Sequence, residues 1–93
     1  MRKYELMVVF PMEEDLFKTG TDTVRQTLTE FGAQIISEEP YGERDLTYEI
    51  KKRTRGRYLL FNINAEPANI VEIDRQFKLN TNILTFLFIR VEE

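Results

Sequence analysis

The sequence predicts an α+β fold in which four strands form one antiparallel sheet and two helices cover one face of it. Four segments either alternate apolar and polar residues or are short apolar runs, as strands do. In two other segments, apolar residues recur at every third or fourth position, as in helices. The 93 residues can bury one modest core, so we expect a single domain over residues 1–93.

The first strand and the first helix follow from these periods. Residues 2–10 alternate, and Pro11 closes the strand. Residues 13–31 have a helical period, with acidic residues in the first turn, where the helix dipole favours negative charge. Gly32 is expected to form a left-handed C-terminal cap. Gly20 in mid-helix costs about 1 kcal/mol relative to alanine, which a close approach of the helix to the sheet explains.

Residues 33–52 form a second, long extended segment whose inward positions change parity. Ile35 is odd, whereas the later apolar residues are even: Leu46, Tyr48 and Ile50. A slip of one residue reverses every side chain's face, so the segment needs a bulge. The stretch "PYG" at 40–42 is the expected place.

A hairpin is expected to join the second strand to the third. Residues 53–56, "RTRG", read as its turn, with Gly56 free to take a positive φ. Residues 58–63, "YLLFNI", then form the third strand.

The second helix and the last strand complete the chain. Pro67 opens the helix at its favoured first position, and Asn80 or Asn82 ends it. Residues 83–91, "ILTFLFIRV", form a strand with almost no polar face, as expected of a buried strand.

The resulting order, β-α-β-β-α-β, folds most simply as a ferredoxin-like sandwich. Right-handed crossovers place both helices on one face of the sheet. The first and third strands should lie in the centre, with the fourth beside the first and the second beside the third.

Composition excludes several kinds of chemistry. The chain has no cysteine and no histidine, which excludes nucleophilic triads, thiol chemistry and imidazole or thiolate metal sites. Carboxylate pairs at Glu13 and Asp15, Glu38 and Glu39, and Glu92 and Glu93 read as a helix N-terminus, a strand edge and a solvated tail. We therefore expect no enzymatic activity, no metal and no cofactor.

No apolar run in the sequence approaches the roughly 20 residues of a membrane helix.

A cluster of positive charge stands out in this chain of net charge −3. Five of its 13 basic residues fall within seven positions: Lys51, Lys52, Arg53, Arg55 and Arg57. Such a hairpin can engage several RNA phosphates at once. It can equally be a solvated turn whose charges protect an edge strand from aggregation. The charges alone favour neither interpretation.

The sheet face without helices is a second candidate site. If the even residues of the first strand face the helices, six apolar side chains are exposed on the other side: Met7, Val9, Tyr58, Leu60, Leu87 and Ile89. An apolar patch of this kind usually marks a partner surface. Shielding by long side chains and homodimerisation are alternatives.

Four stretches carry a resemblance to a known family: "MRKYE" at the start, "FGA" at 31–33, "YGERDLTYEIKKRTRGRYLLF" at 41–61 and "FKLNTNILTFLFIR" at 77–90. In this order they resemble the bacterial small-subunit ribosomal protein number six family. The resemblance implies a ferredoxin-like fold, no catalysis and a cytoplasmic, ribosomal location. It also implies a structural role in the central domain (platform), with small-subunit rRNA and ribosomal protein number eighteen as partners.

The resemblance extends the candidate RNA-binding set beyond the basic cluster. Arg2 and Tyr4 match the start of the family pattern, and Arg44 matches its second strand. The last strand departs from the pattern, because Thr85 stands where the family often has arginine. The alternative to a ribosomal role is a stand-alone ferredoxin-like binding module, either a homodimer or a ligand sensor.

Overall fold

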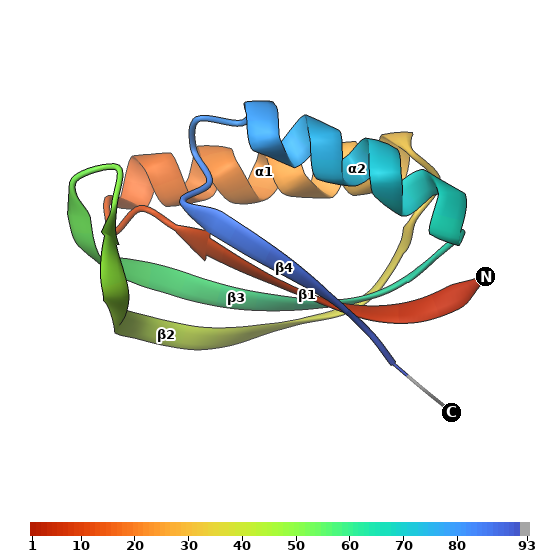
Figure 1. The fold of residues 1–93 in the computed structure, drawn as a ribbon, viewed down its shortest axis with the longest axis horizontal. Helices are drawn as coiled ribbons and strands as arrows, with labels where there is room; N and C mark the ends of the chain where they lie inside the picture. Colours follow the sequence, from red (N-terminus) through yellow and green to blue (C-terminus); the bar gives the residue numbers. More distant parts are fainter. Residues whose placement is uncertain (92–93) are drawn as a thin grey trace.

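The computed structural model describes residues 1–91 and confirms the ferredoxin-like architecture. Its elements, in chain order, are β1 (Arg2–Phe10), α1 (Glu14–Glu30), β2 (Gln34–Ile50), β3 (Arg53–Ala65), α2 (Pro67–Leu79) and β4 (Thr85–Arg90). The antiparallel sheet has the order β2-β3-β1-β4, as expected. Both helices lie on one face of it (Figure 1), called here the helix face; the other is the open face. The predicted tail pair Glu92 and Glu93 lies outside the described residues.

The core lies between the helix face and the two helices. It contains the even side chains of β1, the predicted inward residues of β3, and the buried stripes of the helices: Tyr4, Leu6, Val8, Phe10, Leu59, Phe61, Ile63, Val24, Leu28, Ile73 and Phe77. Phe86 and Phe88 of β4 pack against Phe77, with ring centroids 5.3 Å and 6.1 Å from it. The predicted facing of β1, β3 and β4 is therefore confirmed.

One glycine within α1 and one directly after it behave as the sequence suggests. A Cβ atom at Gly20 would lie 2.8 Å from Cδ1 of Phe10 and 3.0 Å from the carbonyl oxygen of Asn82. The helix thus comes very close to the end of β1 and to the α2–β4 loop, which explains a glycine there. Gly32 has a φ of +82° directly after the helix, as a left-handed cap requires.

β2 is the most irregular strand. Its register with β3 shifts between Ile35 and Ser37, between Pro40 and Gly42, and between Asp45 and Ile50. The second shift is the expected bulge. The inward position predicted for Tyr48 is wrong: the side chain is 80% exposed, because pairing is interrupted at the third shift.

The predicted turn at 53–56 is also wrong. The chain reverses at Lys51 and Lys52, whose φ angles of +50° and +64° form a two-residue turn, and Arg53 already belongs to β3. Gly56 is inside the strand and does not have a positive φ. A Cβ atom there would lie 2.5 Å from Cγ1 of Val9, so this glycine permits close packing rather than a turn.

The hairpin of β2 and β3 curls toward the N-terminal end of α1 (Figure 1) and is fixed there by its basic side chains. Nη1 of Arg53 lies 2.6 Å from both carboxylate oxygens of Glu13. Nζ of Lys51 donates a hydrogen bond of 2.8 Å to the carbonyl oxygen of Ile83 in the α2–β4 loop. Three segments distant in sequence are thereby connected at one end of the molecule.

A second ion pair connects the middle of α1 to β2. Nε and Nη2 of Arg25 each lie 2.8 Å from one carboxylate oxygen of Glu38, which is the bidentate geometry that guanidinium and carboxylate groups prefer. The hydrogen bonds that Arg25 donates to Glu38 raise the pKa of Arg25. The carboxylate of Glu38 thus has a structural role, because it connects β2 to α1.

Gly56→Ala should destabilise the protein by about 1–3 kcal/mol, the usual cost of overpacking, because the new methyl group collides with Val9. Thermal or urea unfolding measures the loss. Gly42→Asn is the matched control: Gly42 has a φ of +80° and open space around it, and asparagine tolerates that backbone. Equal stability of the Gly56→Ala variant and the wild type would contradict the close contact.

Glu13 should titrate at an unusually low pH in the folded protein. The hydrogen bond from Arg53 holds the pKa of the Glu13 carboxyl group below its ordinary range. A lowered folded-state pKa stabilises the fold above the unfolded-state pKa, and this contribution disappears as the pH falls through the folded-state value. Carboxylate NMR titration measures the effect. Arg53→Gln should return the pKa of Glu13 toward its ordinary value, whereas Arg55→Gln should leave it unchanged.

Candidate nucleic-acid and protein-partner surfaces

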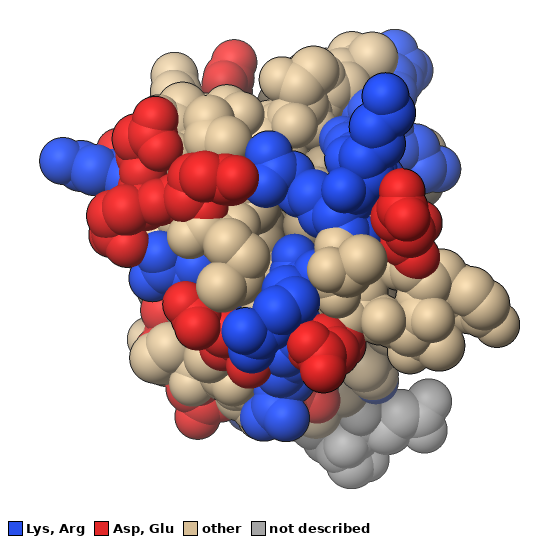
Figure 2. All heavy atoms as spheres, turned by 90° about the vertical axis from the view of Figure 1, so that its left-hand side faces the viewer, with Lys and Arg blue, Asp and Glu red and all other residues tan. Residues whose placement is uncertain are grey.

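The pleat of β3 directs three arginines of the basic cluster to the same face. Arg57 pairs in register with Phe10, whose side chain lies on the helix face, so Arg55 and Arg53 point to that side as well. Each meets a carboxylate, at 2.6–3.1 Å: Arg53 with Glu13, Arg55 with Asp45, and Arg57 with Glu14. Figure 2 shows this end of the molecule, where acidic side chains lie among the basic ones. The cluster is therefore largely neutralised by the protein itself.

Arg57 is the most firmly held of these arginines. Its Cζ lies 3.6 Å from the ring centroid of Phe17, a cation–π contact, and its side chain is only 25% exposed. Its Nη1 lies 2.6 Å from Oε2 of Glu14. The ring and the carboxylate together position the guanidinium group over the first turns of α1.

Lys52 differs from the rest of the cluster. It is exposed at the tip of the hairpin, and it forms no ion pair or hydrogen bond with any residue in the 1–91 range that the structure describes. Its φ of +64° is unfavourable for a residue with a Cβ atom. Backbone strain of this kind is concentrated at functional positions, and asparagine or glycine would form the same turn without it.

The remaining RNA-binding candidates lie apart from the cluster. Arg44 is exposed and pairs in register with Gly56, which places it on the open face. Arg2 pairs with Ala65 at the opposite end of β1 from Phe10, about 26 Å away for a strand of this length. Tyr4 is only 8% exposed and packs edge to face against Phe88 at 6.5 Å. The predicted set therefore does not form a single site, and its contacts with RNA stay a prediction.

The predicted apolar patch on the open face is only partly exposed. Leu87 and Ile89 are 59% and 47% exposed, and Met7 and Tyr58 are half-buried. Val9 and Leu60, however, are buried, so their predicted exposure is wrong. The β4 residues of the predicted patch are therefore exposed, whereas its central residues, Val9 and Leu60, are not.

Leu46 explains why Val9 is covered. A Cβ atom at Gly56 would touch both Val9 and Leu46, the latter at 3.5 Å, so all three meet on the open face. The inward position predicted for Leu46 is wrong, because the curled hairpin places this side chain beside Val9 on the open face. Leu60 lies in the middle of the sheet, with Glu39 and Met7 as its register partners on either side.

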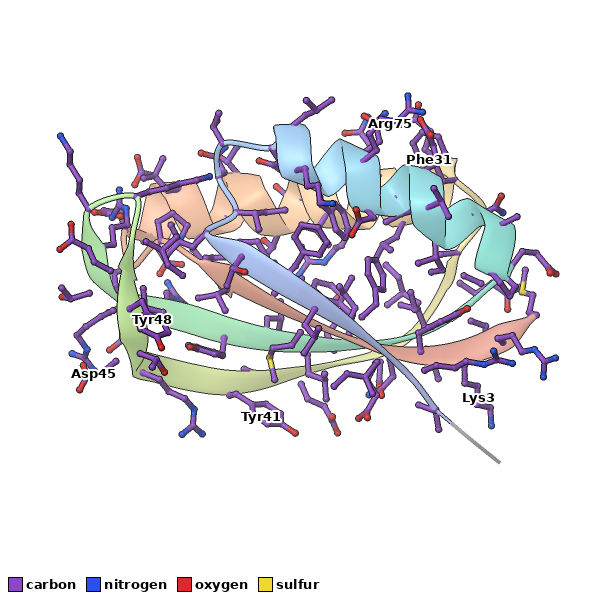
Figure 3. All side chains as sticks on the ribbon, viewed as in Figure 1. Lys3, Phe31, Tyr41, Asp45, Tyr48 and Arg75 are labelled. Atoms are coloured by element: carbon purple, nitrogen blue, oxygen red, sulfur yellow. The ribbon has the colours of Figure 1, made fainter. Side chains whose placement is uncertain are left out.

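Sequence reasoning missed a shallow pocket of about 400 Å³ at the other end of the open face. Ile36 and Val91 contribute apolar walls, and Lys3, Glu5, Asn62 and Asn64 contribute polar groups. Figure 3 shows Lys3 and Tyr41 pointing away from the helices on this side. Ile36 is 61% exposed because it sits at the first register shift of β2, and no residue pattern marks that shift.

Residues 1–91 contain no group of three or more His, Cys, Asp or Glu side chains that could hold a metal ion. Among the same residues, neither helix combines the length and apolarity needed to cross a membrane.

The sequence is similar over its whole length to proteins of one known family. Residues 3–90 match the family model described as Ribosomal protein S6. The small ribosomal subunit protein bS6 of Treponema denticola is 61% identical over the full length of both chains. The proteins of the same name from Treponema pallidum (strain Nichols) and Salinispora tropica are 49% and 36% identical; each alignment covers 99% of this chain, and 99% and 98% of the respective relative.

Two solved structures share the fold. The crystal structure of 30S ribosomal protein S6 from Thermotoga maritima superposes with a TM-score of 0.86 at 24% identity, covering 97% of this chain and 87% of that one. The C-terminal domain of the MgtC protein from Mycobacterium tuberculosis reaches a TM-score of 0.66 at 9% identity, covering 99% and 89%. These likenesses confirm the fold alone.

The family match and the end-to-end relatives bear on function as well. They confirm the expected ribosomal and non-enzymatic character, with the cytoplasmic ribosome as the location. By sequence over its whole length, the chain belongs to the bacterial ribosomal protein S6 family.

Proposed function

We propose that this chain is a structural constituent of the small ribosomal subunit that binds small-subunit rRNA in the central domain (platform) together with ribosomal protein number eighteen. The observation that carries the proposal is the end-to-end match to small ribosomal subunit proteins from three species of two genera, at identities from 61% to 36%. The geometry supports it with exposed cations that form no ion pair within residues 1–91, and with one exposed apolar edge.

Lys52 is the first candidate for the rRNA contact. It is exposed at the tip of the hairpin, and no carboxylate among the described residues competes for its charge. Arg44 and Arg2 are likewise exposed, with no ion pair inside the described part of the chain. Three separated cations suit contacts with phosphates along an extended RNA surface, which position the protein without reading sequence.

The partner protein is proposed to cover the open face along β4. Leu87 and Ile89 are exposed there although β4 is apolar on both of its faces, a pattern that the sequence suggested for a buried strand. β4 is the edge of the sheet, so its open-face residues have neighbours on one side only. A partner over this edge would bury them, together with Ile36 and Val91 farther along the same face.

Affinity purification of the tagged chain tests the proposal as a whole. Small ribosomal subunits should co-purify and remain bound at moderate salt. Sedimentation of the pure protein tests the alternative. A tight homodimer that fails to bind small-subunit rRNA with ribosomal protein number eighteen would favour a stand-alone binding module.

Lys52→Gly should change stability and binding in opposite directions. Removing the Cβ atom at a φ of +64° should stabilise the fold by roughly 0.5–1 kcal/mol after the entropic cost of glycine. Losing one phosphate contact should reduce the slope of log affinity against log salt by about 1 for the complex of rRNA and partner. Thermal unfolding and salt-dependent binding assays measure the two effects.

Two variants control this prediction. Lys52→Ala keeps the Cβ atom and should lose the same binding without the gain in stability. Arg75→Ala removes a positive charge from α2 (Figure 3), on the side of the molecule away from the open face, and should leave the salt slope unchanged. An unchanged slope for both Lys52 variants would remove the hairpin tip from the RNA interface.

Leu87→Asp combined with Ile89→Asp should weaken binding to ribosomal protein number eighteen at least tenfold, since a charge would then be buried in an apolar contact. Both side chains are exposed in the free protein, so its thermal stability should change little. Isothermal titration calorimetry measures the loss. Leu79→Asp, at a 70% exposed position on α2, is the control and should bind normally.

A further inference from the structure

We propose that Glu13 and Glu14 determine RNA specificity by masking: their carboxylates occupy the guanidinium groups of Arg53 and Arg57 and keep these arginines from the phosphates of non-cognate RNA. The inference rests on the proposed rRNA-binding function. It assigns a role to Glu13 and Glu14, which are not among the proposed rRNA contacts. It accounts for a cluster of positive charge that the protein covers with its own acids.

The geometry of the two pairs supports this role. Arg53 contacts both oxygens of Glu13 at 2.6 Å, and Arg57 contacts Glu14 at 2.6 Å. The arginine side chains are 31% and 25% exposed, whereas those of Glu13 and Glu14 are 50% and 81% exposed. The carboxylates therefore lie on the solvent side of the pairs, where an approaching phosphate meets them before it meets the arginines.

Glu13 is placed for this contact rather than for a helix cap. It occupies the N-cap position of α1, with φ and ψ of −64° and 131°, yet its side chain makes no capping hydrogen bond. Instead, its carboxylate is committed to Arg53, and the bond lowers the pKa of Glu13. The contact therefore favours the negative form of the carboxylate.

A phosphate and a carboxylate compete for the same donors. Both accept hydrogen bonds from the planar fork of a guanidinium group. The carboxylate belongs to the same folded chain and so has a high effective concentration at the arginine. The dipole of α1 adds to its preference for that place. A phosphate must displace it, so RNA that offers only phosphates gains little from Arg53 and Arg57.

Asp45 covers Arg55 more weakly. The distance from Nε of Arg55 to Oδ1 of Asp45 is 3.1 Å, and the side chains are 50% and 86% exposed. Figure 3 shows Asp45 at the outer edge of the curled hairpin. Of the three covered arginines, the two that face α1 are thus the ones whose masking should matter most.

The test compares a masking variant with a variant of equal charge. Glu13→Gln with Glu14→Gln removes two negative charges, as does Asp15→Asn with Glu30→Gln. Asp15 and Glu30 are exposed acids of α1 that form no ion pair within residues 1–91. Each full-length variant, checked for folding by circular dichroism, is titrated with poly(U) and, in parallel, with platform rRNA plus ribosomal protein number eighteen.

Unmasking should appear as a steeper salt dependence on poly(U). Two new contacts with a single strand add about 1.4 to the magnitude of the slope, so the loss of affinity between 50 and 200 mM salt should grow by about sevenfold. Binding to the cognate complex should change less, which lowers the specificity ratio. Adding Arg53→Gln and Arg57→Gln to the masking variant should cancel the gain.

Each other outcome has a defined meaning. An equal gain in the Asp15→Asn and Glu30→Gln variant would show an effect of net charge and overturn the masking role. No gain in the Glu13→Gln and Glu14→Gln variant would overturn it as well, provided that the wild type binds the cognate complex. A wild type that binds neither RNA would instead refute the proposed function on which the inference rests.

Discussion

The close contact between β3 and β1 at Gly56 is the constraint on which the functional end of the molecule depends. Because Gly56 has no side chain, Val9 occupies the space where a Cβ atom would be, and β3 can curl across the end of β1. The curl brings the hairpin to α1 and to the α2–β4 loop, where Arg53 and Lys51 find their partners. It also lays Leu46 over Val9 and so closes part of the open face. One missing methyl group thus decides both where the basic hairpin lies and how much apolar surface remains for a partner.

The basic cluster shows how far formal charge and available charge can differ. The sequence brings five cations together in seven positions, but the fold commits four of them to internal partners. Exposed ion pairs of this kind add little stability, so their main effect is on what the surface offers to an anion. The face in Figure 2 is accordingly a mixture of both signs rather than a positive patch. Lys52 alone among the five presents an unshared charge to solvent within the described residues.

The sequence was sufficient for the parts of the fold with a strong apolar period. β1, both helices and the inward residues of β3 follow from alternation or helical spacing, and Pro67 and Gly32 mark boundaries by their backbone requirements. β2 could not be predicted in the same way, because polar residues occupy both of its faces and its register shifts three times. The turn at Lys51 and Lys52 carries no turn residue at all, whereas Gly56 nearby gave a misleading signal. The masking carboxylates were visible as a helix N-terminus, but their contacts are formed across about 40 residues of chain and have no local pattern.

The lysine turn also has a consequence for the order in which the protein folds. A hairpin forms early when its two central residues favour positive φ by themselves, as asparagine and glycine do. Here both positions are lysines that reach this backbone only at a cost in conformational energy, so the loop has little tendency to nucleate the pairing of its strands. The hairpin must instead be closed by contacts with α1 and the α2–β4 loop, which exist only after β1 and β3 have met across more than 40 residues of chain. We therefore expect its tip to be among the last parts of the structure to become ordered, after the chain has closed across the centre of the sheet.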